Sequence, residues 1–171
     1  MMLKLILCLA AVGTGTLIGI RAAKTYSCRL KLLMELRNGF AQLENSVVYG
    51  NLPLLDAFEA VKCGEYAGPI FREAAGNLRE NRSMAVQNAF MAAFEFLPGK
   101  GYLDGEDMAV IAQFTEHLGS SGLSGQQKNF EFIQKQLGQR IEEARCRREK
   151  NQRMAKSLGV LGGMFVALMI L

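Results

Sequence analysis

The sequence lacks tryptophan and has only one histidine, His117, among its 171 residues. Its four cysteines include no pair at CxxC spacing, so they suggest neither a zinc site nor a disulfide framework. A lone histidine without neighbouring ligands is a poor metal centre, and we expect it to lie at the end of a helix. The glycine-rich stretch 119–125 has no preceding strand and no Gly-Lys-Ser/Thr, so it is not a phosphate-binding loop. We therefore expect no catalytic residue, cofactor or metal.

Charge is unevenly distributed along the chain, whose net charge is +4. Residues 21–37 and residues 140–156 each carry a net charge of +4. Residues 38–139, with seven basic and twelve acidic side chains, carry −5. A nucleic-acid-binding domain usually gathers its positive charge on one face, beside side chains that read bases. Here the positive charge flanks two apolar ends instead, so we expect no nucleic-acid partner.

The two ends of the chain are uncharged apolar segments, Leu5–Ile20 and Leu158–Leu171. As helices they would be roughly 24 and 21 Å long, shorter than a hydrocarbon core of about 30 Å. Snorkelling lysine and arginine side chains and modest bilayer thinning can close this gap. We predict a membrane helix with a basic flank at residues 1–24, a helical domain at 25–156 and a second membrane helix at 157–171. The alternative is a soluble helical adaptor whose apolar ends complete its own core.

The positions of the basic residues predict the orientation in the membrane. Nineteen of the twenty lie between the two apolar segments, so the positive-inside rule places the middle domain in the cytoplasm. Each segment also contains a glycine pair at four-residue spacing, which lets helices approach closely in lipid. The pairs are Gly15 with Gly19 and Gly159 with Gly163. We expect the two membrane helices to pack together through them, with membrane lipids around them.

The segment between the apolar ends shows helical periodicity throughout. From residue 30 to residue 48, apolar residues recur at steps of three and four, which places them on one helix face. They are Leu33, Leu36, Phe40, Leu43 and Val47. Similar stripes predict five further helices, beginning near residues 54, 69, 83, 104 and 126, with Ser83 and Asp104 as N-caps. The second should end at Gly64, and the last can continue into the C-terminal apolar segment. The predicted fold class is an all-α six-helix bundle.

The connection between the first two helices, residues 49–53, is the candidate partner surface. Gly50 can adopt the left-handed conformation that ends a helix, and Pro53 suits the first turn of the next one. Neither requirement explains Tyr49, whose ring could cover the end of the bundle or contact a partner. We therefore select Tyr49, Gly50 and Pro53 as candidate partner-surface residues.

Several motifs resemble the stage III sporulation protein AB family. Near the N-terminus these are Met-Leu-Lys-Leu at residues 2–5 and Leu-x-x-Leu-x-x-Gly-x-x-Gln-Leu-Glu at residues 33–44. Tyr-Gly-Asn-Leu-Pro-Leu at residues 49–54 and Leu-Gly-Val-Leu-Gly at residues 158–162 are the more specific elements. Phe-Thr-Glu-His-Leu-Gly at residues 114–119 and Gln127-Lys128 extend the resemblance over the whole chain. The family usually continues this Leu-Gly with Ser-Asp, whereas this chain has Ser-Ser-Gly-Leu-Ser-Gly.

The resemblance implies a membrane component of the complex that links mother cell and forespore during endospore formation. The middle domain of that family is similar to the cytoplasmic domain of the type II secretion system F platform protein. By this similarity, the domain would dock a secretion-type ATPase, and the membrane helices would join other membrane proteins of a secretion channel. The expected location is the mother-cell membrane, and the expected role is structural rather than enzymatic.

Overall fold

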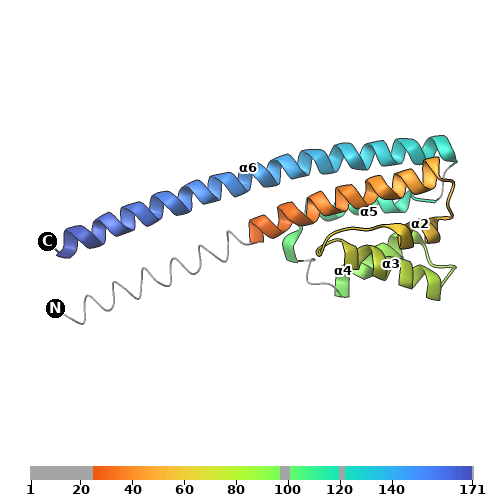
Figure 1. Ribbon diagram of the computed structural model, residues 1–171, viewed down its shortest axis with the longest axis horizontal. Helices are drawn as coiled ribbons and strands as arrows, with labels where there is room; N and C mark the ends of the chain where they lie inside the picture. The colour runs from red at the N-terminus through yellow and green to blue at the C-terminus, as the bar shows by residue number, and fades with distance from the viewer. Residues whose placement is uncertain (1–24, 97–100, 120–121, 171) are drawn as a thin grey trace. The chain divides into compact units, whose positions relative to one another are not determined.

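The computed structural model describes residues 25–96, 101–119 and 122–170, which form helices joined by short connections and contain no strand (Figure 1). The first helix covers residues 25–44 and passes into a short π-helix, η1 (Asn45–Tyr49). Five further helices follow: α2 (Leu54–Ala60), α3 (Gly68–Glu80), α4 (Val86–Phe96), α5 (Gly105–Glu116) and α6 (Leu123–Ile170). For the described residues, the prediction of an all-α fold with six helices is confirmed, apart from the short η1 turn.

The chain divides into two compact units, of which Arg29–Glu142 is one. We call this unit the helical domain. The other unit comprises the two ends of the chain, and α6 continues without a break from Leu123 to Ile170. Within the described ranges, no helix combines the length and the apolar character that a membrane crossing requires. The N-terminal membrane helix predicted for residues 1–24 lies outside the described residues.

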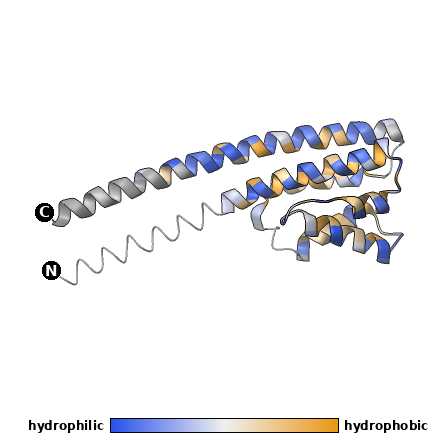
Figure 2. Ribbon diagram, viewed as in Figure 1, coloured by the Kyte–Doolittle hydropathy of each residue, from blue (hydrophilic) through white to orange (hydrophobic). Residues whose placement is uncertain are grey.

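Phenylalanine side chains form the centre of the helical domain. Phe40 of the first helix lies 4.8–5.6 Å, between ring centroids, from one phenylalanine on each of α3, α4 and α5. These partners are Phe71, Phe90 and Phe114. Such ring pairs contribute about 0.5–1.5 kcal/mol each beyond the burial of their surface. The first helix is thus the central element, and Figure 2 shows hydrophobic and hydrophilic residues interleaved along the helices, as amphipathic packing requires.

The second helix is shorter than predicted. It ends at Ala60 instead of Gly64, because Val61 has the extended angles φ −64° and ψ 122°. Gln42 of the first helix explains the difference: its side-chain amide donates to the Lys62 carbonyl and accepts from the Lys62 amide, both at 2.9 Å. This two-point contact holds an extended backbone, and a sequence window around α2 contains no sign of it.

The starts of α4, α5 and α6 can be compared with the predicted caps and first residues. Asp104 does cap α5, in a reciprocal capping box with Asp107. Ser83 does not cap α4, which begins at Val86; the Ser83 hydroxyl and amide instead donate to the Asn81 side chain within a turn. The last helix begins at Leu123, about one turn earlier than predicted.

Candidate docking surface

The connection between the first helix and α2 exposes two large apolar side chains. Tyr49 is 68% exposed and Leu52 is 42% exposed. The backbone around them is nevertheless held in place, because the Gly50 amide donates to the Asn45 carbonyl at 2.9 Å and the Leu52 amide to the Ser46 carbonyl at 3.0 Å. We call residues 49–53 the corner.

The local sequence explains why the helix loosens before the corner. The η1 residues Asn-Ser-Val-Val-Tyr combine short polar side chains, which compete for backbone hydrogen bonds, with β-branched ones, which lose rotamer freedom in a helix. A π-helical turn of this kind is rare and is frequently found at functional sites. It places Tyr49 outside the core, where most of its ring is exposed, and the alternative interpretation as a partner contact stays a prediction.

The structure revises the roles predicted for Gly50 and Pro53. Gly50 has φ −86°, so it does not adopt the left-handed conformation, which belongs to Asn51 at φ 50°. Gly50 is suited to the corner for a different reason: a Cβ atom there would lie 2.7 Å from the Ser46 carbonyl oxygen. Pro53 is the N-cap of α2 rather than a first-turn residue, with φ −53° and ψ 144°. Its lack of an amide proton is harmless at that position.

Glu35 of the first helix holds the start of α3. Its carboxylate accepts hydrogen bonds from the Tyr66 and Ala67 amides, both at 2.8 Å. The connection passes so close to this carboxylate that a Cβ atom on Gly64 would lie 2.4 Å from it. The first helix therefore fixes both ends of the α2–α3 connection, through Gln42 and through Glu35.

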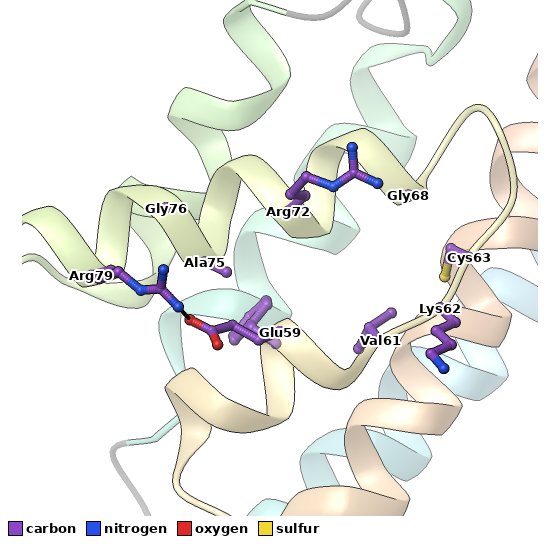
Figure 3. Close-up of a pocket in the computed structure, with 10 residues that line it drawn as sticks. Glu59, Val61, Lys62, Cys63, Gly68, Arg72, Ala75, Gly76 and Arg79 are labelled. Carbon is purple, nitrogen blue, oxygen red and sulfur yellow. Dashed lines mark hydrogen bonds and ion pairs between the residues drawn. The ribbon is translucent and has the colours of Figure 1, made fainter.

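A groove of about 520 Å³ lies between α2 and α3 (Figure 3). We call it the α2–α3 groove; it is lined by Phe58, Glu59, Val61, Lys62, Cys63, Gly68, Arg72, Ala75, Gly76 and Arg79. Its apolar part includes two buried residues of the domain core, Phe58 and Ala75. The rest of the lining is dominated by basic side chains, one on the connection and two on α3.

The charge of the groove is opposite to that of the segment around it. Three of the seven basic residues in segment 38–139 line the groove, but only one of its twelve acidic residues does. That acid, Glu59, forms an ion pair with Arg79 (Figure 3). In the part of the chain that the structure describes, Lys62 and Arg72 form no ion pair. Two basic groups of the groove thus remain available for an external anion.

Sequence reasoning missed this groove, although α3 carried a signal for it. Arg72, Gly76 and Arg79 follow one another at steps of four and three, so they share one helix face. That face is basic and contains an interior glycine, in an otherwise acidic stretch of chain. Lys62 joins it only because the extended connection brings the end of α2 beside α3, which no local pattern reports.

A buried ion pair links the first helix to α5. Arg29 is 5% exposed and Asp107 is 0% exposed. Arg29 donates from Nε and Nη2 to the two carboxylate oxygens of Asp107 at 2.8 and 2.9 Å, and its Nη2 lies 2.7 Å from Asp104 Oδ2. The hydrogen bond to Asp107 raises the pKa of Arg29. Arg29 therefore contributes to the net charge of segment 21–37, but its own charge is buried and paired.

The Cys63 thiol of the helical domain has little nucleophilic reactivity. Burial, and then the nearby Glu35 carboxylate, raise the pKa of Cys63 to about 11, so its reactive thiolate is scarce at neutral pH. Cys146 is exposed. No group of His, Cys, Asp or Glu side chains suited to a metal ion occurs among the described residues.

Comparison with known proteins identifies the family of the chain. The family model for stage III sporulation protein AB matches residues 4–171, nearly the whole chain. This chain belongs to the stage III sporulation protein AB family. The stage III sporulation protein AB of Bacillus subtilis (strain 168) is 27% identical over 172 residues, which cover 99% of this chain and 100% of that relative. No solved structure matches the chain significantly.

Membership of the stage III sporulation protein AB family supports a role in sporulation. Of the residues selected from sequence, Tyr49, Gly50 and Pro53 lie in the corner, and their role as a partner surface stays a prediction. Gly15 and Gly19 lie outside the described residues, and Gly159 and Gly163 lie in the helical backbone of α6. Packing between these glycine pairs stays a prediction.

Proposed function

We propose that the protein is a membrane platform of the sporulation secretion channel that links mother cell and forespore. In this role the helical domain lies in the cytoplasm and docks a secretion-type ATPase. Family membership over nearly the whole chain supports the sporulation role. The exposed corner, held by backbone hydrogen bonds to η1, is the observation that carries the docking role.

The membrane part of the proposal depends on the two apolar ends. Leu5–Ile20 and Leu158–Leu171 contain no charged residue, and both are bordered by clusters of lysine and arginine. Carbonate extraction of the full chain tests this part. Retention in the membrane pellet supports the platform, whereas release of the protein into the supernatant supports the soluble adaptor.

The orientation is tested with a Lys100→Cys variant in intact cells. If the helical domain is cytoplasmic, a membrane-impermeant thiol reagent should label this variant no more than the wild-type chain. Labelling above the wild-type level, without prior permeabilisation, would place the domain on the opposite side of the membrane.

Docking is tested by binding the purified sporulation ATPase to the full chain in detergent micelles. Tyr49 and Leu52 are the exposed apolar residues of the corner, and truncated aromatic anchors commonly cost more than about 1–2 kcal/mol of binding. Tyr49→Ala should therefore weaken ATPase binding at least about tenfold. Met34→Ala is the matched control, because Met34 is 45% exposed but lies about 20 Å away along the first helix.

The two variants separate docking from general damage. Equal weakening by Tyr49→Ala and Met34→Ala would show that the corner has no special role. Absence of ATPase binding by the wild-type chain would remove the ATPase from the proposal.

A further inference from the structure

We propose that the α2–α3 groove binds an acidic segment of a partner protein, with the segment's backbone passing over Gly76 and its carboxylates pairing with Arg72 and Lys62. This site is separate from the corner, and the proposal does not depend on which protein supplies the segment. It combines three observations: the charge of the groove, its apolar floor and the character of Gly76.

The charge of the groove selects the partner. Lys62 and Arg72 are exposed and form no ion pair within the described residues, whereas Arg79 is already paired with Glu59. The surrounding segment 38–139 has a net charge of −5, so two unpaired cations in one groove are a local exception. Complementary charge steers and orients an anionic partner. Because the two cations lie on different elements, they suit an extended chain bearing several carboxylates.

The floor of the groove favours a peptide over a simple anion. Phe58 and Ala75 line it, and both belong to the buried core. Its volume of about 520 Å³ lies within the 300–1,000 Å³ that is usual for small-molecule sites, so it holds side chains rather than a single ion. A peptide that alternates acidic and small apolar residues satisfies both the cations and the floor.

Gly76 provides the independent observation. It lies inside α3 and is exposed, and a Cβ atom built on it would meet nothing within 4 Å. Glycine destabilises a helix interior relative to alanine, so a position with free space would normally favour alanine. The fold itself gives no reason for glycine here. Close approach of another backbone does give one, because glycine is the residue that leaves room for it.

Other glycines of the domain show why Gly76 is unusual. Gly68 also lines the groove, but a Cβ there would lie 3.1 Å from the Cys63 carbonyl oxygen, so the fold accounts for it. Gly101, Gly105 and Gly122 have open space like Gly76, but they lie outside helix interiors, in a turn, at a helix start and before a helix. Gly138, inside α6, has nearly as much room, because a Cβ there would meet only the end of the Arg37 side chain at 3.9 Å. Gly76 differs from all of these glycines in being open, inside a helix and part of the groove lining.

The test uses the full chain in detergent micelles and a short synthetic peptide that alternates Glu with Ala and Leu. The peptide carries an N-terminal tryptophan, whose fluorescence reports binding without background because the chain contains no tryptophan. The wild-type chain should bind this peptide, and binding should weaken as salt is added. The corresponding peptide with Lys in place of Glu should not bind.

Three variants locate the binding. Arg72→Glu should weaken it about tenfold or more, whereas Arg82→Glu, the same charge change on an exposed residue outside the groove, should have little effect. Gly76→Ala should raise the midpoint of thermal unfolding and yet weaken peptide binding several-fold. A stabilised chain that binds less well cannot be explained by damage to the fold.

Each contrary result overturns the proposal. Equal weakening by Arg72→Glu and Arg82→Glu would indicate general charge attraction, and unchanged binding by Gly76→Ala would remove the backbone approach. Absence of peptide binding by the wild-type chain would rule out an acidic peptide as the occupant. The same conclusion would follow if the wild-type chain bound phosphatidylglycerol vesicles but no peptide, and if Arg72→Glu abolished the vesicle binding. The ATPase experiment is independent, since a chain can bind the peptide and fail to bind the ATPase.

Discussion

Asp107→Ala is expected to destabilise the helical domain by about 4 kcal/mol. Removing one partner of a buried ion pair usually costs about 3–5 kcal/mol, because the other charge stays buried without its partner. The lower value applies here, since Arg29 keeps its contact with Asp104 at 2.7 Å. Loss of the Asp107 side chain also opens the capping box of α5, in which Asp107 accepts from the Asp104 amide at 3.1 Å. That loss adds about 1 kcal/mol.

Two further variants test whether the unpaired Arg29 charge causes the stability loss of Asp107→Ala. Asp104→Ala removes the N-cap and the more exposed of the two contacts to Arg29, so it should cost only about 1–2 kcal/mol. The double variant Arg29→Met with Asp107→Leu replaces both charges by apolar groups. It should recover most of the stability, because such replacements of buried pairs are often neutral or stabilising.

The measurement is urea unfolding at neutral pH, followed by far-ultraviolet circular dichroism. The fragment 25–150 is suitable, since Arg29–Glu142 is a compact unit with its own phenylalanine core. We expect this fragment to be soluble, mainly helical, and monomeric or weakly associated. A loss of less than about 1 kcal/mol for Asp107→Ala would contradict the reasoning. Equal losses for Asp107→Ala and the double variant would show that the charge left behind is not the cause.

Three further outcomes follow from exposure and charge. Tyr49→Ala should change the free energy of unfolding of the fragment by less than about 0.5 kcal/mol, because the ring is 68% exposed. A loss of about 2 kcal/mol or more, as expected for a truncated core aromatic, would show that Tyr49 packs in the core. Burial and the Glu131 carboxylate raise the pKa of Glu44, so folding loses stability as pH rises from Glu44's ordinary range through this raised value. Glu44→Gln should therefore stabilise the fragment at pH 7 and not at pH 3, and equal stabilisation at both would contradict this cause. In the folded chain at pH 7.5, Cys146 should react with iodoacetamide much faster than Cys63, whose pKa is about 11; peptide mass mapping distinguishes the two, and equal rates would contradict the assignment.

Hydrophobic periodicity by itself determined the helices and much of the core. Leu33, Leu36, Phe40 and Leu43 were predicted to share one face, and all four are 0% exposed. The capping box at Asp104 was equally readable, because its residues lie within one helical turn. Both signals are local: they depend on side chains a few positions apart on one helix.

The sequence predicted the position of the corner but not its backbone conformations. Its position between two helices followed from Gly50 and Pro53, but the conformations did not. Gly50 is required by the close Ser46 carbonyl, and Asn51 takes the left-handed conformation, which asparagine tolerates. The exposure of Tyr49 was open to two interpretations, because a stripe that reaches the end of a helix does not say whether a neighbour covers it.

Tertiary structure alone determined the buried Arg29–Asp107 ion pair and the basic α2–α3 groove. Arg29 and Asp107 are 78 positions apart, so their pairing depends on how the first helix packs on α5 and not on either segment. The α2–α3 groove depends in the same way on Gln42 and Glu35, which hold the connection extended and bring Lys62 beside the basic face of α3. Periodicity indicates which face of a helix is buried, whereas packing decides which neighbour lies against that face. Packing buried Arg29 of the basic segment 21–37, and it gathered three basic residues of the acidic segment 38–139 into one groove.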